Sequence, residues 1–262
     1  MQASAALPAR SAAQRLRTTT TLGLILGAIA VSAWQTEFSL ASLVLGTVDF
    51  VEFFAKLVPD WSYLPEIWGP LLETVQIAYL GTLFGALLAY PLLFLASINT
   101  APNRVVLMVT RSLLTVLRSI PDLLFAALLA PVLSIGPLPG VVALTLFTIA
   151  VLTKLGSESV EAVDPGPLEA LRAAGATRNQ TIQFAVLPQV GATLTSFLLY
   201  AFEINVRASV VLGLVGAGGI GQDLLGRLNF FAYGDVSLIV LATFALVLAI
   251  DGASIWLRAR LI

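Results

Sequence analysis

Residues 74–103 read TVQIAYLGTLFGALLAYPLLFLASINTAPN, a run without one charged side chain. A helix needs about 20 apolar residues to cross the hydrocarbon core of a bilayer, so this run predicts a tilted span that ends near Ser97. Its apolar residues lie on all sides of the predicted helix and do not alternate as in a β-barrel strand. The run therefore predicts a membrane-embedded helix.

The composition extends this conclusion to the whole chain. Of its 262 residues, 58% are hydrophobic and 11% are charged, against about 45–50% and about 25% in soluble proteins. A soluble enzyme, a disordered regulator and a nucleic-acid-binding module are excluded on this ground. The absence of cysteine and histidine removes disulfides, thiolate or imidazole metal sites, a cysteine nucleophile and the usual general base at neutral pH. A net charge of −1 indicates no polyanionic partner.

Apolar runs of sufficient length give a count of six spans. Residues 123–135 could form only about 20 Å of helix, which is too short to cross the hydrocarbon core of about 30 Å. The third span must therefore reach back towards residues 105–111. This places Arg118 and Asp122 within the membrane. The turn sequence at residues 136–140, GPLPG, separates this span from the next. We therefore expect an all-α, polytopic membrane protein with these six spans: residues 18–34, 74–97, 105–135, 141–157, 179–202 and 236–257.

Orientation follows from the basic residues outside the spans. With six spans, one face of the membrane receives Arg10, Arg15, Arg17, Arg104, Arg172, Arg178, Arg258 and Arg260. The positive-inside rule makes this face cytoplasmic and places both termini there. The predicted parts are a cytoplasmic tail (1–17), a first helix (18–35), an outer loop or interfacial helix (36–67) and a membrane-embedded core (68–262). The N-terminus also suits a cleavable signal peptide, which would leave five spans.

The longest cytoplasmic connection, residues 158–180, contains a short helix. Asp164 followed by Pro165 is a typical helix start, because an oxygen caps free N–H groups and the proline ring presets helical φ. Gly175 is a plausible stop, since glycine adopts the left-handed conformation at little cost. A helix this short is marginal alone, so we expect neighbouring residues to hold it. Three apolar residues share one face at spacings of three: Leu168, Leu171 and Ala174.

This connection resembles the EAA loop of ABC-importer permeases. The matching residues are Glu169-Ala170-Leu171, Gly175, and Ala185-Val186-Leu187-Pro188 at the family spacing. Leu171 stands where the family has alanine, and Ala185 where it has isoleucine. In that family the loop forms a coupling helix seated in a groove of a cytoplasmic ATPase. The resemblance implies this role for Asp164, Glu169, Ala170, Leu171 and Gly175.

A closer resemblance, to phosphonate-importer permeases, covers much of the C-terminal two-thirds. It rests on Arg118–Asp122 (RSIPD), Phe202–Ser209 (FEINVRAS) and Leu212–Gly221 (LGLVGAGGIG). It implies a type I ABC importer permease in a bacterial inner membrane, with a second copy of the chain, two ATPase subunits and an external binding protein. ATP and Mg would bind the ATPases, while this chain would hold no cofactor and catalyse no covalent reaction.

Three other functions stay open. A methionine or other small-solute importer shares the general plan, a secondary transporter would work without an ATPase, and an intramembrane enzyme would need a catalytic group in the bilayer. Among phosphorus compounds, phosphonate, phosphite, phosphate and phosphate esters all present a tetrahedral oxyanion. The sequence does not distinguish between them.

Ionisable residues near the spans are candidates for the translocation pathway, because they are costly in lipid and usually face a polar interior or a partner. A guanidinium group matches the oxygens of a phosphonate. Arg118 and Arg207 also have a structural interpretation, as partners of Asp122 and Glu203 at i,i+4 helix spacing. Asp251, near the end of the last span, is expected to be structural. The pathway candidates are Arg118, Glu203, Asn205 and Arg207.

The glycine-rich run near the C-terminus is a candidate outer gate. A dinucleotide-binding loop would need a preceding strand, which this sequence does not offer. Residues 208–222 are uncharged but too short to span, so we expect a re-entrant or outer-face segment. Its glycines would allow either gating at the outer end of the pathway or tight packing. The residues concerned are Gly216, Gly218, Gly219 and Gly221.

Overall fold

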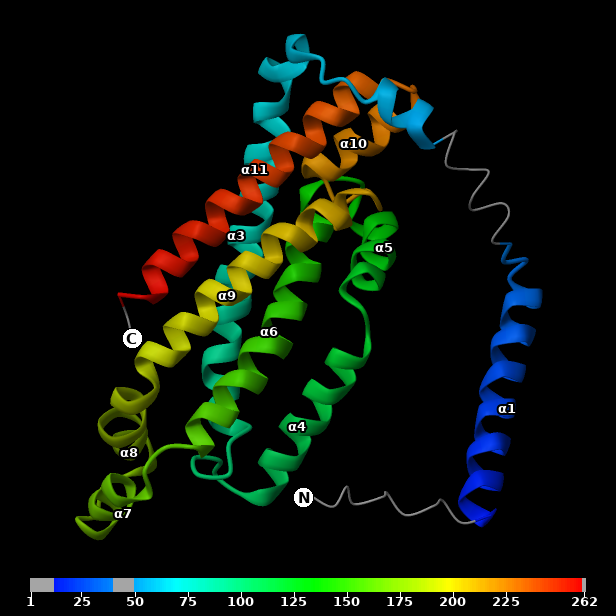
Figure 1. The fold of residues 1–262 in the computed structure, drawn as a ribbon. Helices are drawn as coiled ribbons and strands as arrows, with labels where there is room; N and C mark the ends of the chain where they lie inside the picture. Colours follow the sequence, from blue (N-terminus) through cyan, green and yellow to red (C-terminus); the bar gives the residue numbers. More distant parts are fainter. Residues whose placement is uncertain (1–11, 40–49, 261–262) are drawn as a thin grey trace, which may run out of the picture. The chain divides into compact units, whose positions relative to one another are not determined.

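The structure is a computed structural model that describes residues 12–39 and 50–260 (Figure 1). The described residues form helices joined by short connections and include no strand, which confirms the all-α prediction. The chain divides into two units, residues 1–56 and 57–262, each of which is described by itself. Residues 1–11 of the predicted tail, with Arg10, and residues 40–49 of the predicted outer loop lie outside the described residues.

The first unit contains helix α1 (Ala12–Gln35), and residues 50–56 are also helical. Residues Leu16–Gln35 of α1 are long and apolar enough to cross a membrane, which confirms the first predicted span. The threonine hydroxyls of residues 18–21 donate to backbone carbonyls one turn earlier. These bonds satisfy polar groups that a bilayer would otherwise leave without partners.

The second unit holds the remaining helices. It starts with a 3-10 turn at Trp61–Tyr63, and a π-helical turn at Ile182–Val186 joins α8 to α9. In chain order its α-helices are α3 (Leu64–Leu95), α4 (Arg104–Ser119), α5 (Asp122–Leu133), α6 (Pro137–Glu161), α7 (Pro165–Ala173), α8 (Arg178–Thr181), α9 (Leu187–Gly213), α10 (Gly219–Asn229) and α11 (Tyr233–Arg258).

Helices α3, α6 and α9 form the centre of this unit, and α3 packs most extensively on α6. Gly81 and Gly85, one turn apart on α3, face α6. A Cβ atom at these positions would lie 2.5 Å from a side-chain atom of Leu144 and 2.4 Å from one of Thr148. Small residues at i and i+4 let two helix backbones approach closely, as is usual in membranes. The two glycines therefore set the distance between the central helices.

The third predicted span is not one continuous helix. Helices α4 and α5 are bent by 81° at a break after Ser119. The described residues thus contain five helices able to cross a membrane, or six spans if the bent pair counts as one. The cause is Pro121, which cannot continue the helix and forces Ile120 into an extended conformation with ψ of 120°. Arg118 and Asp122 therefore do not share one helix face, contrary to the i,i+4 pairing considered above.

The boundaries of the later spans differ from the prediction. The expected break falls at Ser134 and Gly136, both with positive φ, and α6 begins directly afterwards with Pro137. The fifth span reaches Gly213 instead of ending at residue 202, because Arg178–Gly213 form one apolar segment. Glu203 and Arg207 therefore lie inside a membrane-spanning helix, and the first part of the segment 208–222 continues α9 instead of re-entering.

Candidate functional site

Helix α7 has the boundaries that its end residues predict. The Asp164 carboxylate accepts a hydrogen bond from the N–H of Gly166 at 2.9 Å, as an N-cap does. At the other end Gly175 adopts φ of +82°, and the N–H of Ala176 donates to the carbonyl of Leu171 at 3.0 Å. This left-handed closure is the usual glycine C-cap. The sequence signals for this helix are confirmed.

One face of α7 is held by the rest of the unit, and the other is free. Leu168 is only 3% exposed and packs in a cluster with residues of α3, α6 and α9, while Leu171 lies at its edge. Glu169 and Ala170 are exposed. These apolar contacts confirm the prediction that neighbouring residues hold this short helix. The exposed face leaves Glu169 accessible to a partner.

Arg207 belongs to a cluster of ion pairs between α9 and α11. Its guanidinium group lies 2.5 Å from Glu203 and 2.7 Å from Asp251. Glu203 also pairs with Arg258 at 2.8 Å. We call these four residues the α9–α11 ion cluster. The pairing of Arg207 with Glu203 is confirmed, and Asp251 is structural through its bond to Arg207.

Arg118 has a different environment. Among the described residues its side chain has neither an ion pair nor a hydrogen bond. It borders a cavity of about 180 Å³ between α4 and α6, and a second cavity of about 270 Å³ with Asp122 and Phe125. In the first cavity the other charged residues are paired, as Arg111–Glu161 and Lys154–Glu158. Arg118 is thus an exposed cation next to a polar recess.

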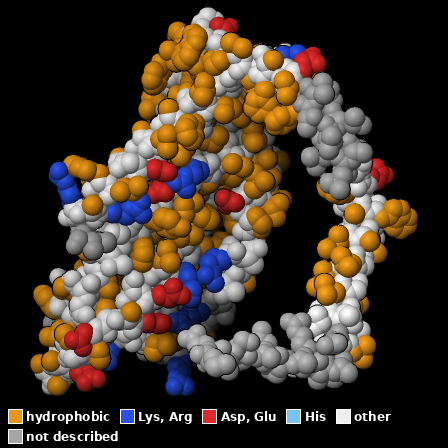
Figure 2. Space-filling view, in the orientation of Figure 1, with side chains coloured by type: hydrophobic (Ala, Val, Ile, Leu, Met, Phe, Trp, Pro, Cys, Tyr) orange, Lys and Arg blue, Asp and Glu red, His pale blue; other side chains and the backbone are white. Residues whose placement is uncertain are grey.

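Charged side chains gather in two places among the hydrophobic side chains in the middle of the face shown in Figure 2, and further charges lie at its upper and lower ends. One group lies over α9 and α11, and the other lies over α4 and the neighbouring part of α6. An ionisable side chain in contact with lipid tails is costly. Within a membrane, these two groups of charged side chains therefore need water or another protein surface beside them.

Asn205, one of the predicted pathway residues, lies in the core. It is 0% exposed, and its Nδ2 donates to the hydroxyls of Thr82 and Thr148, both at 2.7 Å. These bonds join α9 to α3 and α6. The prediction that Asn205 lines the pathway together with the exposed charged residues disagrees with this position. Its side chain has no exposed surface in the described unit.

The glycine-rich run makes a tight turn between α9 and α10. Gly216, Gly218 and Gly219 have positive φ, and the carbonyl of Gly216 accepts from the N–H of Gly136 at 2.9 Å. A Cβ atom at Gly219 would lie 2.6 Å from Thr74 Oγ1, and one at Gly221 only 1.9 Å from the carbonyl oxygen of Val210. These glycines therefore permit close backbone packing, which is one of the two roles considered for them.

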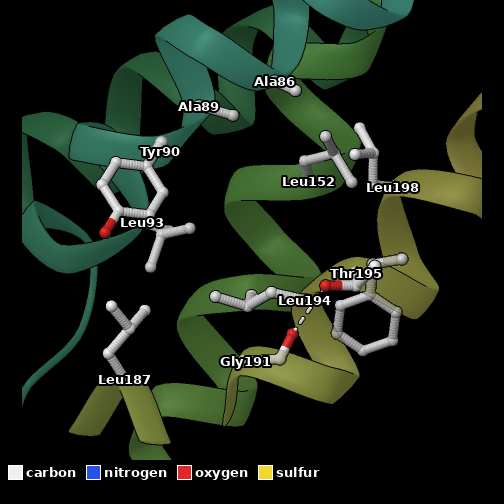
Figure 3. A pocket seen from close by; sticks show the side chains of 11 residues that line it. Ala86, Ala89, Tyr90, Leu93, Leu152, Leu187, Gly191, Leu194, Thr195 and Leu198 are labelled. Atoms are coloured by element: carbon white, nitrogen blue, oxygen red, sulfur yellow. Dashed lines mark hydrogen bonds between the residues drawn. The ribbon is translucent and has the colours of Figure 1, made fainter. Parts of the chain in front are cut away.

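A cavity that the sequence did not indicate lies between α3, α6 and α9 (Figure 3). Its volume is about 340 Å³, and its walls are apolar: Ala86, Ala89, Tyr90, Leu93, Leu152, Leu194 and Leu198 are among the lining residues. The hydroxyl of Thr195 is already bonded to the carbonyl of Gly191 at 2.9 Å. This cavity therefore offers no charged group to an oxyanion.

A comparison of the sequence with known protein families finds a match over most of the second unit. Residues 81–261 match the family described as binding-protein-dependent transport system inner membrane component. The chain belongs to this family. It is therefore a multi-pass inner-membrane permease component of a transport system that depends on a binding protein.

Two curated relatives agree with the family assignment, and one solved structure shows the same fold. The phosphite transport system permease protein PtxC of Stutzerimonas stutzeri is 36% identical over 239 residues, which cover 90% of this chain and 87% of PtxC. The phosphate-import permease protein PhnE of Mycolicibacterium smegmatis is 38% identical over 233 residues, 88% of this chain and 44% of PhnE. A structure of the MetNI methionine ABC transporter in an inward-facing conformation shares the fold, with a TM-score of 0.68 and 22% identity over 78% of this chain and 99% of that chain.

Proposed function

We propose that this chain is the permease subunit of an ATP-driven importer for a phosphorus oxyanion, of the phosphite, phosphonate or phosphate type. The assignment to the importer class is supported by helix α7, which is held in place by the buried Leu168 and presents Glu169 outward. The substrate class is supported by the relatives named for phosphite and phosphate, which match about nine-tenths of the chain. The methionine transporter, at 22% identity, supports the fold alone.

The proposed assembly contains two copies of the chain, two ATPase subunits and an external binding protein. The exposed face of α7, with Glu169 and Ala170, is the docking surface for the ATPase. Asp164 and Gly175 fix the ends of this helix, and Leu171 supports it from below. ATP and Mg bind to the ATPase subunits, and this chain contributes no cofactor site.

Orientation in the membrane follows from charge. Arg104 begins α4, Arg172 lies in the last turn of α7, Arg178 begins α8, and the last helix ends with Arg258. Under the positive-inside rule these segments, both termini and α7 lie on the cytoplasmic side. This is the side on which an ATPase finds its nucleotide.

Arg118 is the pathway residue in this proposal. A phosphorus oxyanion needs donors to replace its water, and a guanidinium group without a carboxylate partner can supply them. Arg207 cannot do so while Glu203 and Asp251 bind it. Weak binding at a single arginine also permits release, which a transport pathway requires. The turn at Gly216–Gly221 closes the outer end of the pathway by tight packing.

Transport then proceeds by alternating access. Closure of the two ATPases on ATP brings the two α7 helices together and opens the space between the permease copies to the loaded binding protein. Hydrolysis returns that space to the cytoplasmic side. Any ligand-dependent shift of this kind requires different contacts in the two states, and α7 is where the ATPase makes them.

The test is ATP hydrolysis by the permease reconstituted with its cognate ATPase, with the binding protein added empty or loaded with phosphite, phosphate or aminoethylphosphonate. We expect stimulation only by the loaded form. Glu169→Ala should reduce it about tenfold or more, as for an interface residue worth about 2 kcal/mol.

Asn179→Ala, an exposed polar truncation in the same connection, is the matched control and should behave as the wild type. If the permease neither binds the ATPase nor changes its rate, the importer proposal fails and a secondary transporter becomes the better candidate.

A further inference from the structure

The loop between α3 and α4, residues 96–103, is held by side chains from several helices. Arg111 on α4 donates from Nε to the carbonyl of Ala96 at 2.8 Å. Glu161, the last residue of α6, accepts from the N–H of Ile98 at 2.7 Å and forms an ion pair with Arg111. One carboxylate and one guanidinium group thus join the loop to α4 and α6.

The connection that carries α7 holds the same loop from its other side. Arg172, in the last turn of α7, donates from Nη2 to the carbonyl of Asn99 at 2.7 Å. Arg178, the first residue of α8, donates from Nε to the carbonyl of Thr100. The two arginines lie on either side of the Gly175 turn, so both ends of that turn are tied to consecutive loop carbonyls.

The loop is itself well ordered by internal bonds. Ser97 and Thr100 are buried, and their hydroxyls donate to the carbonyls of Leu93 and Phe94 at 2.6 and 2.7 Å. The side chain of Asn99 donates to the carbonyl of Val160 at 3.0 Å. A segment with its polar groups satisfied in this way moves as one piece with its neighbours instead of deforming between them.

The far end of this network reaches the proposed pathway. Arg111 and Arg118 are seven residues apart on α4, which is about two helical turns, so they lie on the same face. Both border the cavity of about 180 Å³ between α4 and α6. A shift of the loop that carries Arg111 with it therefore also displaces Arg118.

We propose that the α3–α4 loop connects α7 mechanically to α4, with Arg172 and Arg178 as the positioning residues that transmit movement of the ATPase to Arg118. This inference rests on the proposed function, because it assumes that an ATPase moves α7. Arginine suits the role, since its planar donors hold backbone carbonyls in a fixed geometry and stay charged at every physiological pH. The two side chains act through the loop and touch no substrate.

The experiment compares the double variant Arg172→Ala/Arg178→Ala with Arg104→Ala in the reconstituted complex of permease, ATPase and loaded binding protein. Arg104 begins α4 at the end of the same loop, and its side chain has no bonded partner among residues 12–39 and 50–260. Phosphite uptake and ATP hydrolysis are measured on the same vesicles. We expect the double variant to lose about tenfold in phosphite transported per ATP, a coupling loss in the usual range, while Arg104→Ala keeps the wild-type ratio.

The ratio separates coupling from folding, because a misfolded permease lowers uptake and hydrolysis together. Arg172→Lys serves as the conservative variant. It should keep part of the phosphite transported per ATP that the alanine substitution loses, since lysine can donate to one carbonyl. An unchanged ratio in the double variant with intact assembly would overturn the proposal. If the wild-type permease fails to stimulate its ATPase at all, the proposed function itself is wrong, which is a different result.

Discussion

Arg118 and Arg207 look alike in the sequence but differ in the structure. Each has a carboxylate four residues away, Asp122 after the first and Glu203 before the second. In the structure Arg207 binds Glu203 at 2.5 Å and Asp251 as well, whereas Arg118 has no partner in the described chain. One arginine stabilises the fold, and the other stays available to a ligand.

Helix continuity explains the difference. Helix α9 runs unbroken from Leu187 to Gly213, so i,i+4 neighbours on it meet. Helix α4 ends at Ser119, and the bend of 81° turns Asp122 away into α5. A proline between two charged residues can therefore separate a binding group from its counter-ion, and spacing alone does not reveal which case applies.

The strongest test removes the available cation. Arg118→Gln should lower phosphite uptake about tenfold to a hundredfold, because a hydrogen bond to a charged group contributes about 1.5–3 kcal/mol. Thermal stability should not change, since no bond within the described protomer is lost. Uptake at saturating loaded binding protein and a melting curve measure the two effects. Arg104→Gln, another unpaired arginine of α4, is the control and should transport normally.

Breaking the ion cluster should affect stability instead of transport. Glu203→Gln leaves Arg258 without its carboxylate and Arg207 with Asp251 alone. We expect a loss of about 2 kcal/mol in the free energy of unfolding, between the values for an exposed and a buried ion pair, because Glu203 is largely buried and Arg207 is half exposed. The readout is thermal unfolding in detergent. Uptake normalised to folded protein should stay near the wild-type value, and a specific loss of uptake would place Glu203 in the pathway.

A continuous helix through position 121 should make Arg118 more like Arg207, which is paired with a carboxylate. Pro121→Ala removes the residue that ends α4 and allows Arg118 and Asp122 to approach each other at i,i+4 spacing. Such a pair contributes only about 0.3–0.5 kcal/mol, so uptake should fall about twofold. The double variant Pro121→Ala/Asp122→Asn should regain it. No recovery in the double variant would show that the bend matters for another reason.

The smallest effect is expected at Asp122 itself. Within residues 12–39 and 50–260, its carboxylate accepts a single hydrogen bond, from the N–H of the next residue, Leu123, at 2.9 Å. Asp122→Asn should therefore change stability by less than about 0.5 kcal/mol, because the side-chain oxygen of asparagine can still accept this bond, and uptake should stay at the wild-type value. A large gain in uptake would reveal that Asp122 screens Arg118 in the working protein.

Local signals in the sequence predicted the elements that depend on local chemistry. Asp164-Pro165 and Gly175 bound α7 as expected, and apolar length identified the spans. The complete break after Ser119 was not predicted, because the short apolar run after Asp122 required a span that reaches back to residues 105–111. Asn205 was grouped with Glu203 and Arg207, although a residue two positions from each on a helix lies on the opposite side, so helical spacing could have separated it from them.

The network around the α3–α4 loop had no sequence signature. Arg172 and Arg178 donate to backbone carbonyls, which every residue possesses, so no partner side chain could have indicated them. The positive-inside rule accounted for both arginines without assigning them contacts. The apolar cavity between α3, α6 and α9 was missed for a similar reason, because its lining has the composition of any helix core.

The difference between the two arginines can be measured directly because the chain contains no cysteine. Arg118→Cys and Arg207→Cys are each treated, in the reconstituted complex, with a water-soluble thiol reagent that attaches an ammonium group. We predict that Arg118→Cys reacts, that loaded binding protein slows the reaction, and that the restored charge recovers part of the phosphite uptake. Arg207→Cys should recover none. Recovery at position 207 with no reaction at position 118 would contradict the account.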